Sequence, residues 1–285
     1  MNQLKERGMK IVFLIAACTS VLAVAFICIF LFANGIPAIG KIGVADFLFG
    51  ETWRPSNDIY GILPMILGSI YVTAGAIILG VPIALLTSVF LAYYCPKRMY
   101  PVLQSAVSLM AGVPSVVYGF FGLVMIVPTM QQITGRDGSN MLTASILLAI
   151  MILPTIVGVT ESAIRSVPGS YYEGSLALGA THERSVFCAI LPAAKSGLIA
   201  GVVLGIGRAI GETMAVIMVA GNQARMPAGL LRGIRTLTSN IVLEMGYAAD
   251  LHREALIATG VVLFVFILII NLAVSLLNRR AENGN

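Results

Sequence analysis

Six apolar runs, each long enough to cross a membrane, constrain the fold of this chain more than any other feature. A helix needs about 20 mostly apolar residues to span the hydrocarbon core of a bilayer. Only 11% of the residues are charged, whereas soluble domains carry about 25%. We therefore expect an all-α membrane protein with six transmembrane helices, forming one domain over residues 1–285 with its core at about 64–278. The runs lie near residues 11–33, 64–93, 102–128, 142–164, 197–221 and 254–278.

The basic residues near the ends of the chain predict its orientation. Lys5, Arg7 and Lys10 precede the first apolar run, and basic residues are enriched on the cytoplasmic side of membrane proteins. Six spans would return the C-terminal Arg279 and Arg280 to the same side. We expect a multi-pass protein with both termini in the cytoplasm. The first run is too long for a signal peptide and lacks a small-residue cleavage site, so we interpret it as a retained helix.

One motif resembles a nucleotide site and is rejected. The segment GIPAIGKI, residues 35–42, matches the first seven positions of a phosphate-binding P-loop. It has Ile42 where a Ser or Thr must reach magnesium, and it follows an apolar helix instead of a strand. We therefore expect no nucleotide cofactor in this chain. If ATP drives the protein, another subunit must bind it.

Cysteines and histidines predict neither a metal site nor an enzyme. The four cysteines, Cys18, Cys28, Cys95 and Cys188, have no CxxC spacing, which zinc and redox sites require. His182 and His252 are predicted in solvated loops on opposite membrane faces, so the two cannot serve one site. The sequence contains no nucleophile paired with a base, and a membrane enzyme is the least supported function class.

The largest predicted cytoplasmic loop, residues 165–197, contains two candidate amphipathic helices. The loop is too polar to span the membrane, yet its segments LALGA and SVFCAILP place apolar residues at helical spacing. A break is expected near Gly179. Such helices either lie on the lipid surface or dock into a soluble subunit.

The spacing within this loop resembles that of permeases from ATP-binding-cassette importers. Their pattern is EAA, three residues, Gly, nine residues, then Ile, any residue, Leu and Pro. Glu173 opens the pattern here, Gly179 falls at its glycine, and Leu191 and Pro192 close it. The resemblance implies a type I permease fold, in which this loop between helices 4 and 5 holds the coupling helices that insert into an ATPase. The positions that depart from the pattern are Gly174, Ser175 and Ala189.

Further stretches narrow this resemblance and cover most of the chain. They are FLFGETW and YGILPMILGSIYVT in the first third, AGVPSVVYGFFG at 111–122, ILPTIVGVTESAIRSVP at 152–168 and GRAIGETMAV at 207–216. Together they are similar to the C-type permeases of phosphate-specific transport systems. The tract from Phe47 to Thr73, with an outer loop that contains Trp53, carries the likeness to the C-type.

That resemblance implies an ATP-driven importer of inorganic phosphate in a bacterial cell membrane, working by alternating access. The implied partners are a companion A-type permease in a heterodimer, two ATPase subunits and an external phosphate-binding protein. The chain would be a transporter subunit and not an enzyme. ATP and magnesium would bind to the partner ATPase, and no nucleic acid would be involved.

Two charged residues interrupt the fifth apolar run. Arg208 and Glu212 are four residues apart, so on a continuous helix they share a face and can meet. Each charge at the bilayer centre costs about 2.5–3.5 kcal/mol, whereas a helical ion pair returns only about 0.2–0.5 kcal/mol. A self-satisfied ion pair is one interpretation. Our hypothesis is that Arg208 offers a transient oxyanion site and that Glu212 competes for the same guanidinium, so that the anion can leave.

Other polar residues are weaker candidates for the substrate path. Ser115 and Tyr118 follow Pro114, which removes a backbone hydrogen bond, and they either line the path or accompany a packing kink. Glu161 and Arg165 repeat the four-residue spacing near a helix end, where we expect a structural surface pair. Three outer-loop arginines could meet an acidic binding protein, although solvated charge is the default. These are Arg225, Arg232 and Arg235.

Two alternatives remain beside the phosphate importer. A secondary transporter or channel for an anion would equally place charges within the membrane, but it leaves the loop pattern unexplained. An importer for another oxyanion, such as sulfate, molybdate or phosphonate, would also suit an arginine. Phosphate therefore rests on the resemblance alone.

Overall fold

The chain is almost entirely helical, and its computed structural model describes residues 2–282, with the side chains of residues 6–273. One short antiparallel hairpin pairs β1 (Trp53–Arg54) with β2 (Ile59–Tyr60). The α-helices are α1 (Asn2–Ile42), α2 (Val44–Phe49), α3 (Leu63–Val89), α4 (Tyr100–Gly112), α5 (Ser115–Phe121), α6 (Val127–Thr134), α7 (Met141–Ser166), α8 (Gly169–Ala177), α9 (His182–Ser185), α10 (Leu191–Ala193), α11 (Lys195–Gly211), α12 (Met214–Val219), α13 (Leu237–Glu244) and α14 (Asp250–Glu282). Single π-helical turns follow α3, α5 and α9, at Phe90–Tyr94, Gly122–Ile126 and Val186–Ile190.

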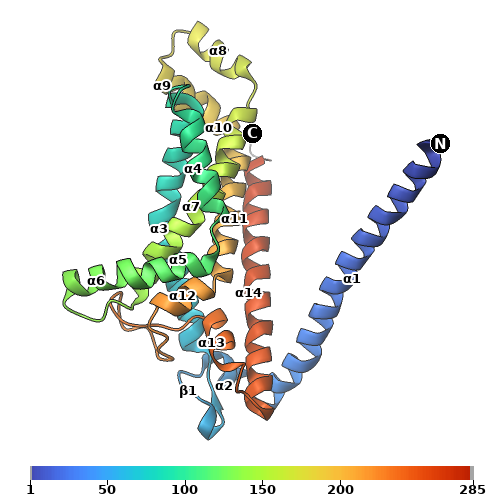
Figure 1. Ribbon diagram of the computed structural model, residues 1–285, viewed down its shortest axis with the longest axis vertical. Coiled ribbons are helices and arrows are strands. Elements are labelled where there is room, and N and C mark those ends of the chain that lie inside the picture. Colours follow the sequence, from blue (N-terminus) through green and yellow to red (C-terminus); the bar gives the residue numbers. More distant parts are fainter. Residues whose placement is uncertain (1, 283–285) are drawn as a thin grey trace.

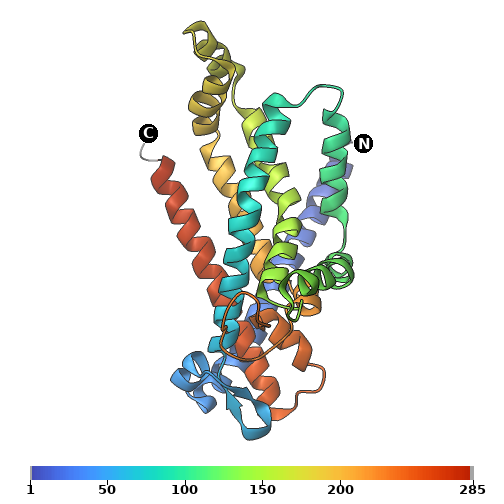
Figure 2. The same ribbon diagram turned by 90° about the vertical axis from the view of Figure 1, so that its left-hand side faces the viewer.

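The centre of the molecule is a bundle of α3, α7 and α11, which lie side by side along the long axis (Figure 2). Helix α7 supplies the fully buried Leu147, Met151 and Ile156. Small residues let α11 approach it closely, because a Cβ atom at Gly205 would lie 2.6 Å from the side chain of Ile156. Within a bilayer the hydrophobic effect does not drive helices together, because the lipid is itself apolar. Helices there associate through close packing at small residues.

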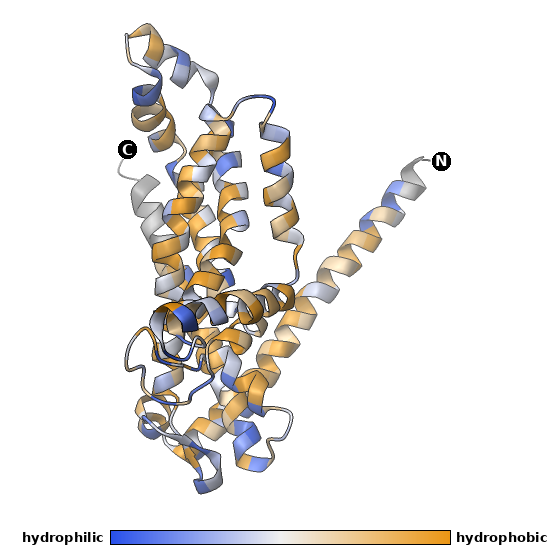
Figure 3. Cartoon of the chain, turned by 60° about the vertical axis from the view of Figure 1, so that its left-hand side comes forward, coloured by the Kyte–Doolittle hydropathy of each residue, from blue (hydrophilic) through white to orange (hydrophobic). Residues whose placement is uncertain are grey.

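Membrane-spanning helices are present as expected. Within the described part of the chain, five helical segments are long and apolar enough to cross a bilayer, or six if the segments His182–Ala193 and Lys195–Gly211, bent by 71°, form one span. Hydrophobic residues follow the long helices, and hydrophilic residues gather at the two ends and in the loops (Figure 3). The all-α membrane fold is confirmed, but two of the six predicted helices are broken.

The third predicted span, residues 102–128, is not one helix. Helix α4 ends at Gly112, and Val113 is extended at φ −71° and ψ 126°. The cause is Pro114, which lacks an N–H and disfavours a helical conformation of the preceding residue. Beyond the break, α5 and α6 run across the bundle instead of along it (Figure 1).

The fifth predicted span, residues 197–221, is also broken. Helix α11 ends at Gly211, and Glu212 is extended at φ −69° and ψ 130°. Gly and Thr on either side of Glu212 are weak helix formers. The short α12 that follows packs against α5, and a Cβ atom at Gly119 would lie only 2.9 Å from Cα of Ala215. The far halves of the two broken helices thus pair with each other.

The first helix leans away from the bundle (Figure 1). Its contact with α14 lies at its C-terminal half, where the rings of Phe32 and Phe264 meet edge-on with centroids 5.7 Å apart. Apolar side chains nearer its start, such as Phe13 and Phe26, are exposed. Lipid or another protein chain must cover this surface in a membrane.

The two ends of the molecule differ. Helices α8 to α10 lie at the same end as the start of α1 and the end of α14, whereas the hairpin, α2 and α13 lie at the opposite end (Figure 1). We call these the coupling end and the hairpin end. His182 is in α9 and His252 is in the first turns of α14, so the expectation that they cannot share a site is confirmed.

Candidate functional site

The loop at residues 165–197 folds as two short helical segments separated by a turn, as expected. The first helix, Gly169–Ala177, begins before the predicted segment LALGA, most of which forms the turn. Helix α8 carries Glu173, and the chain turns at Gly179, whose φ of +84° favours glycine. The second segment runs from α9 through a π-helical turn to α10, which contains Leu191 and Pro192. The π-helical turn is a feature that helical periodicity did not predict.

The inner side of this loop is fixed to the end of α3 by aromatic side chains. Tyr172 and His182 share a 2.6 Å hydrogen bond between the hydroxyl and Nδ1. The rings of Tyr93 and Tyr94, from the π-helical turn after α3, lie against His182 with centroids 6.3 and 4.8 Å away. The expectation of a solvated His182 was therefore wrong, because the loop folds back over the membrane helices.

Glu161 and Arg165 form an ion pair in which Arg165 is exposed and Glu161 is buried. Arg165 Nε donates to Glu161 Oε1 over 2.8 Å, and the Tyr100 hydroxyl donates to the same oxygen over 2.8 Å. Arg165 Nη2 also donates to the carbonyl oxygen of Leu91 over 2.8 Å. The Glu161 side chain is only 4% exposed. The pair connects α7 to α4 and to the end of α3. It was expected as a structural surface pair, and only the burial of Glu161 departs from that expectation.

Arg208 and Glu212 do not form the predicted pair. Because α11 ends at Gly211, the two residues no longer share a helical face. The Oε1 atom of Glu212 instead accepts from the backbone N–H of Ala215 over 3.1 Å. The hydroxyl of Thr238 donates to the Glu212 carbonyl oxygen over 3.1 Å. These two bonds satisfy groups at the break, which is how an irregular backbone is tolerated at membrane depth.

Arg208 itself is half-buried and has one side-chain partner. Its Nη1 donates to Thr155 Oγ1 on α7 over 3.2 Å. Within the described side chains, no carboxylate lies within ion-pair distance of Arg208. Since a guanidinium has five N–H donors, most of them are free to bind a ligand.

The surface around Arg208 is open. Gly211 lies three residues after Arg208, and Gly158 lies three residues after Thr155, so each glycine shares a helical face with its polar neighbour. A Cβ atom at either glycine would meet no heavy atom within 4 Å. The face of α7 and α11 that carries Arg208 is thus uncovered in this chain.

Tyr118 lies at the kink beside Pro114, in line with one of the two interpretations that its sequence position allowed. It is buried, and its hydroxyl donates to the carbonyl oxygen of Met110 over 2.9 Å. This bond crosses the break at Pro114 and satisfies a carbonyl at the end of α4. The kink interpretation therefore explains Tyr118. Ser115 begins α5 and is half-buried.

At the hairpin end, a buried carboxylate joins three segments of the chain. Glu244 accepts from Arg235 Nη1 over 2.5 Å and from Trp53 Nε1 over 2.8 Å, and it lies 2.9 Å from Nε2 of His252. The expectation of solvated Arg235 and His252 was wrong, because their side chains are only 16% and 14% exposed. Sequence reasoning missed this cluster because Trp53 and Glu244 are 191 positions apart.

No cofactor site emerges from the described residues. The P-loop-like segment 35–42 is helical, as the end of α1, so its backbone N–H groups cannot wrap a phosphate. Among the described side chains of residues 6–273, no three of His, Cys, Asp or Glu lie close enough together to hold a metal ion.

Comparisons with known proteins now define the family. Residues 80–283 match the family described as binding-protein-dependent transport system inner membrane component. The chain is 38% identical to the probable ABC transporter permease protein YqgH of Bacillus subtilis, covering 94% of this chain and 91% of that protein. It is 33% identical to the phosphate transport system permease protein PstC of Mesorhizobium japonicum, covering 86% and 81%.

Solved structures agree on the fold. An inward-facing MetNI methionine ABC transporter gives a TM-score of 0.64 at 20% identity, covering 81% of this chain and 99% of that chain. A bacterial ABC transporter that imports alginate gives 0.63 at 16% identity, covering 93% and 95%. Both are ABC transporters that carry other substrates, so their likeness concerns the fold. The chain belongs to the inner-membrane component family of binding-protein-dependent transport systems, as a multi-pass permease subunit of an ATP-binding-cassette importer that works with an ATPase and a substrate-binding protein.

Proposed function

We propose that this permease carries inorganic phosphate and that Arg208 binds the anion transiently on its way through the membrane. The observation that carries the proposal is a half-buried arginine on an uncovered helix face, with no carboxylate partner among the side chains that the structure describes. Curated relatives named as phosphate transport permeases, at 30–33% identity, support phosphate as the substrate.

The chemistry of Arg208 suits an oxyanion. A dehydrated phosphate must exchange water for hydrogen-bond donors, and a guanidinium offers a planar pair of them. Thr155 occupies one donor and fixes the orientation of the side chain. In this arrangement Glu212 does not compete for the guanidinium. Its proposed part in the path is to stabilise the break between α11 and α12, while Tyr118 stabilises the break beside Ser115.

A companion permease would cover the open face. An arginine that faces lipid is costly, and the face bearing Thr155 and Arg208 is not covered by this chain. We propose an A-type permease as the second half of a heterodimer, so that the anion path runs between the two subunits. Alternating access would then follow from movement of one subunit against the other.

The coupling end would face the cytoplasm and dock into one of the two ATPase subunits of the complex. The turn at Gly179 presents Leu178, which is 90% exposed, and the second segment presents Phe187, which is 52% exposed. Exposed apolar side chains beside the exposed Glu173 suit a protein surface more than water. With ATP and magnesium bound to the ATPases, α8 and the segment ending at Leu191 and Pro192 would transmit their movement, and both termini would be cytoplasmic.

Uptake by liposomes that contain the full complex tests the substrate. Labelled phosphate should accumulate only when ATP and the binding protein are supplied, and excess sulfate should not compete. Accumulation without ATP would favour a secondary transporter, and competition by sulfate would favour another oxyanion.

A pair of matched variants tests the coupling loop. Leu178→Glu should prevent co-purification of the ATPase. Leu230→Glu is the control, because Leu230 is 60% exposed in a loop away from the coupling end. Equal ATPase recovery from both variants would contradict a docking role for the turn at Gly179.

A further inference from the structure

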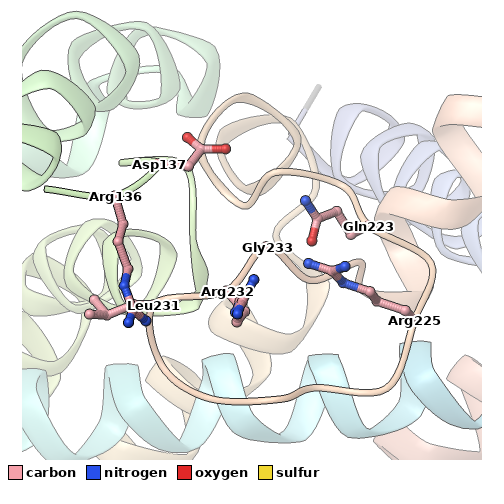
Figure 4. A pocket seen from close by; sticks show the side chains of 7 residues that line it. All are labelled: Arg136, Asp137, Gln223, Arg225, Leu231, Arg232 and Gly233. Atoms are coloured by element: carbon pink, nitrogen blue, oxygen red, sulfur yellow. The ribbon is translucent and has the colours of Figure 1, made fainter. Parts of the chain in front are cut away.

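A polar pocket lies on the side of α5 and α6 that faces away from the coupling end. It has a volume of about 360 Å³ and is lined by two separate loops (Figure 4). The turn between α6 and α7 supplies Arg136 and Asp137, and the loop after α12 supplies Gln223, Arg225 and Arg232. Positive charge predominates, with three guanidinium groups and one carboxylate.

These positive charges have no partner in the described part of the chain. None of the three arginines forms an ion pair or a side-chain hydrogen bond among the described residues. The carboxylate of Asp137 forms no ion pair with them among the described residues, and its Oδ1 accepts from the backbone N–H of Ser139 over 3.0 Å. In Figure 4, Arg136 and Arg225 reach the pocket from opposite sides, and Arg232 lies between them.

The pocket is built on a fixed backbone. The N–H of Met141 donates to the Arg232 carbonyl oxygen over 3.0 Å, and the N–H of Leu142 donates to the Leu230 carbonyl oxygen over 2.9 Å. These bonds join the two loops directly. Gly221, at φ +79°, lets the second loop pass close to the first, since a Cβ atom there would lie 2.7 Å from the Ser139 carbonyl oxygen. The arginines therefore project from a scaffold that holds them together.

We propose that this pocket is a second oxyanion site, at which phosphate binds near the hairpin end before it reaches Arg208. The identification of the anion as phosphate rests on the proposed function. The inference that the pocket binds an anion rests on the geometry of the pocket. Three unpaired guanidinium groups around one concavity concentrate anions, and the amide of Gln223 adds polar groups to the same wall. A volume of about 360 Å³ leaves room for a hydrated oxyanion. Because the arginines are exposed, binding should be weak and sensitive to salt.

Equilibrium binding of labelled inorganic phosphate to the full complex, without the binding protein, tests this site. The Arg208→Gln background removes the proposed membrane site, so that remaining binding reports the pocket. In that background, phosphate should bind and be released by added salt. Replacing Arg136, Arg225 and Arg232 together by Gln should weaken binding by about tenfold or more, since hydrogen bonds to charged groups are the strong ones.

Two control variants separate the site from general effects of charge or folding. Arg54→Gln removes an exposed arginine from the hairpin and should leave phosphate binding unchanged. A triple Lys variant keeps the charge but loses the planar donor pair, so binding should fall between wild type and the triple Gln variant. Each complex is checked for assembly by size-exclusion chromatography.

Unchanged phosphate binding by the triple Gln variant would overturn the proposal. If the same variant also bound the purified binding protein more weakly, the three arginines would contact that protein instead of phosphate. Sulfate is used as a second probe, so that the pocket is tested even if another anion is transported. Whether the transporter imports phosphate at all is tested separately, by ATP-driven phosphate uptake with the wild-type complex.

Discussion

Arg208 is half-buried on an open helix face, and Arg235 is largely buried, so the surroundings of these two arginines differ. Arg235 donates to the Glu244 carboxylate over 2.5 Å, to the Asn240 side chain over 3.0 Å and to the Asn222 carbonyl oxygen over 3.1 Å. Among the described side chains, Arg208 donates only to the Thr155 hydroxyl, over 3.2 Å. The Arg235 guanidinium thus has a carboxylate and two further acceptors in its own chain, whereas Arg208 keeps most of its donors free.

This difference separates a structural charge from an available one. A buried arginine that is paired with a carboxylate holds together the helices and loops that supply its partners. Removing the arginine leaves the buried carboxylate charge without compensation. An arginine with a single neutral partner contributes little to folding stability. Because a charge within the membrane is unfavourable in free energy, such an arginine is expected to bind a ligand. The comparison predicts that replacing Arg235 damages folding and that replacing Arg208 damages transport.

The largest expected effect on stability is that of Arg235→Gln. It leaves the Glu244 carboxylate, 8% exposed, without its guanidinium, which should cost about 3–5 kcal/mol. Thermal unfolding of the complex measures this loss, and phosphate uptake per folded complex should remain near wild type. Arg54→Gln, at an exposed position of the same end, is the control. Equal unfolding temperatures for the two variants would contradict a structural role for Arg235.

Glu212→Ala should have an intermediate effect. The variant loses the acceptor for the Ala215 N–H, which should cost about 0.5–2 kcal/mol, as for a lost helix cap. Glu212→Gln retains an amide oxygen at the same place and should cost less. If both substitutions were equally damaging to thermal stability, the carboxylate charge would matter and the capping role would be wrong.

Thr155→Val should have a smaller effect, and on transport more than on stability. The near-isosteric substitution removes the one acceptor that orients Arg208. A hydrogen bond contributes about 1 kcal/mol net, so the phosphate concentration for half-maximal uptake should change by about fivefold. An unchanged uptake curve would show that Arg208 needs no orientation by α7.

The smallest effect under ordinary conditions concerns Tyr60 of the hairpin. Burial, and then the hydrogen bond and negative charge of Asp58, raise the pKa of Tyr60 from 10.0 to about 12. The folded state therefore keeps this proton where the unfolded state loses it. Ionisation in the unfolded state is favoured from pH 10 upward, so stability should fall between pH 10 and about 12 and be unaffected below that range.

Alkaline unfolding monitored by circular dichroism checks the Tyr60 prediction. Tyr60→Phe removes the group that titrates and should flatten the loss of stability in this range. Tyr71→Phe, at an exposed position of α3, is the control and should leave the profile unchanged. A profile that Tyr60→Phe does not alter would contradict the assignment.

Local patterns predicted the fold better than the site. The apolar runs predicted the membrane helices, and the spacing from Glu173 to Pro192 predicted the two helical segments of the coupling loop. These features depend on residues close together in sequence. The break beside Pro114 had a visible cause, since proline disfavours a continuous helix.

Local sequence patterns did not predict the contacts between residues that are far apart in the chain. The break at Glu212 has no proline and depends on the hydroxyl of Thr238, 26 positions away. The partners of Glu244 come from three segments, and the arginine pocket joins two loops that no shared motif connects. Spacing could indicate that Arg208 and Glu212 share a helical face, but only tertiary packing decides whether the helix continues between them.

ATP-driven phosphate uptake by assembled Arg208→Gln complexes, measured beside wild type and Arg208→Lys, tests the central claim most directly. Loss of a charged donor pair should reduce uptake about 10- to 100-fold, with normal assembly and thermal stability. Arg208→Lys should restore only part of it, because lysine lacks the planar donor pair. Wild-type uptake by an assembled Arg208→Gln complex would contradict the account, and Arg208 would then be a structural residue like Arg235.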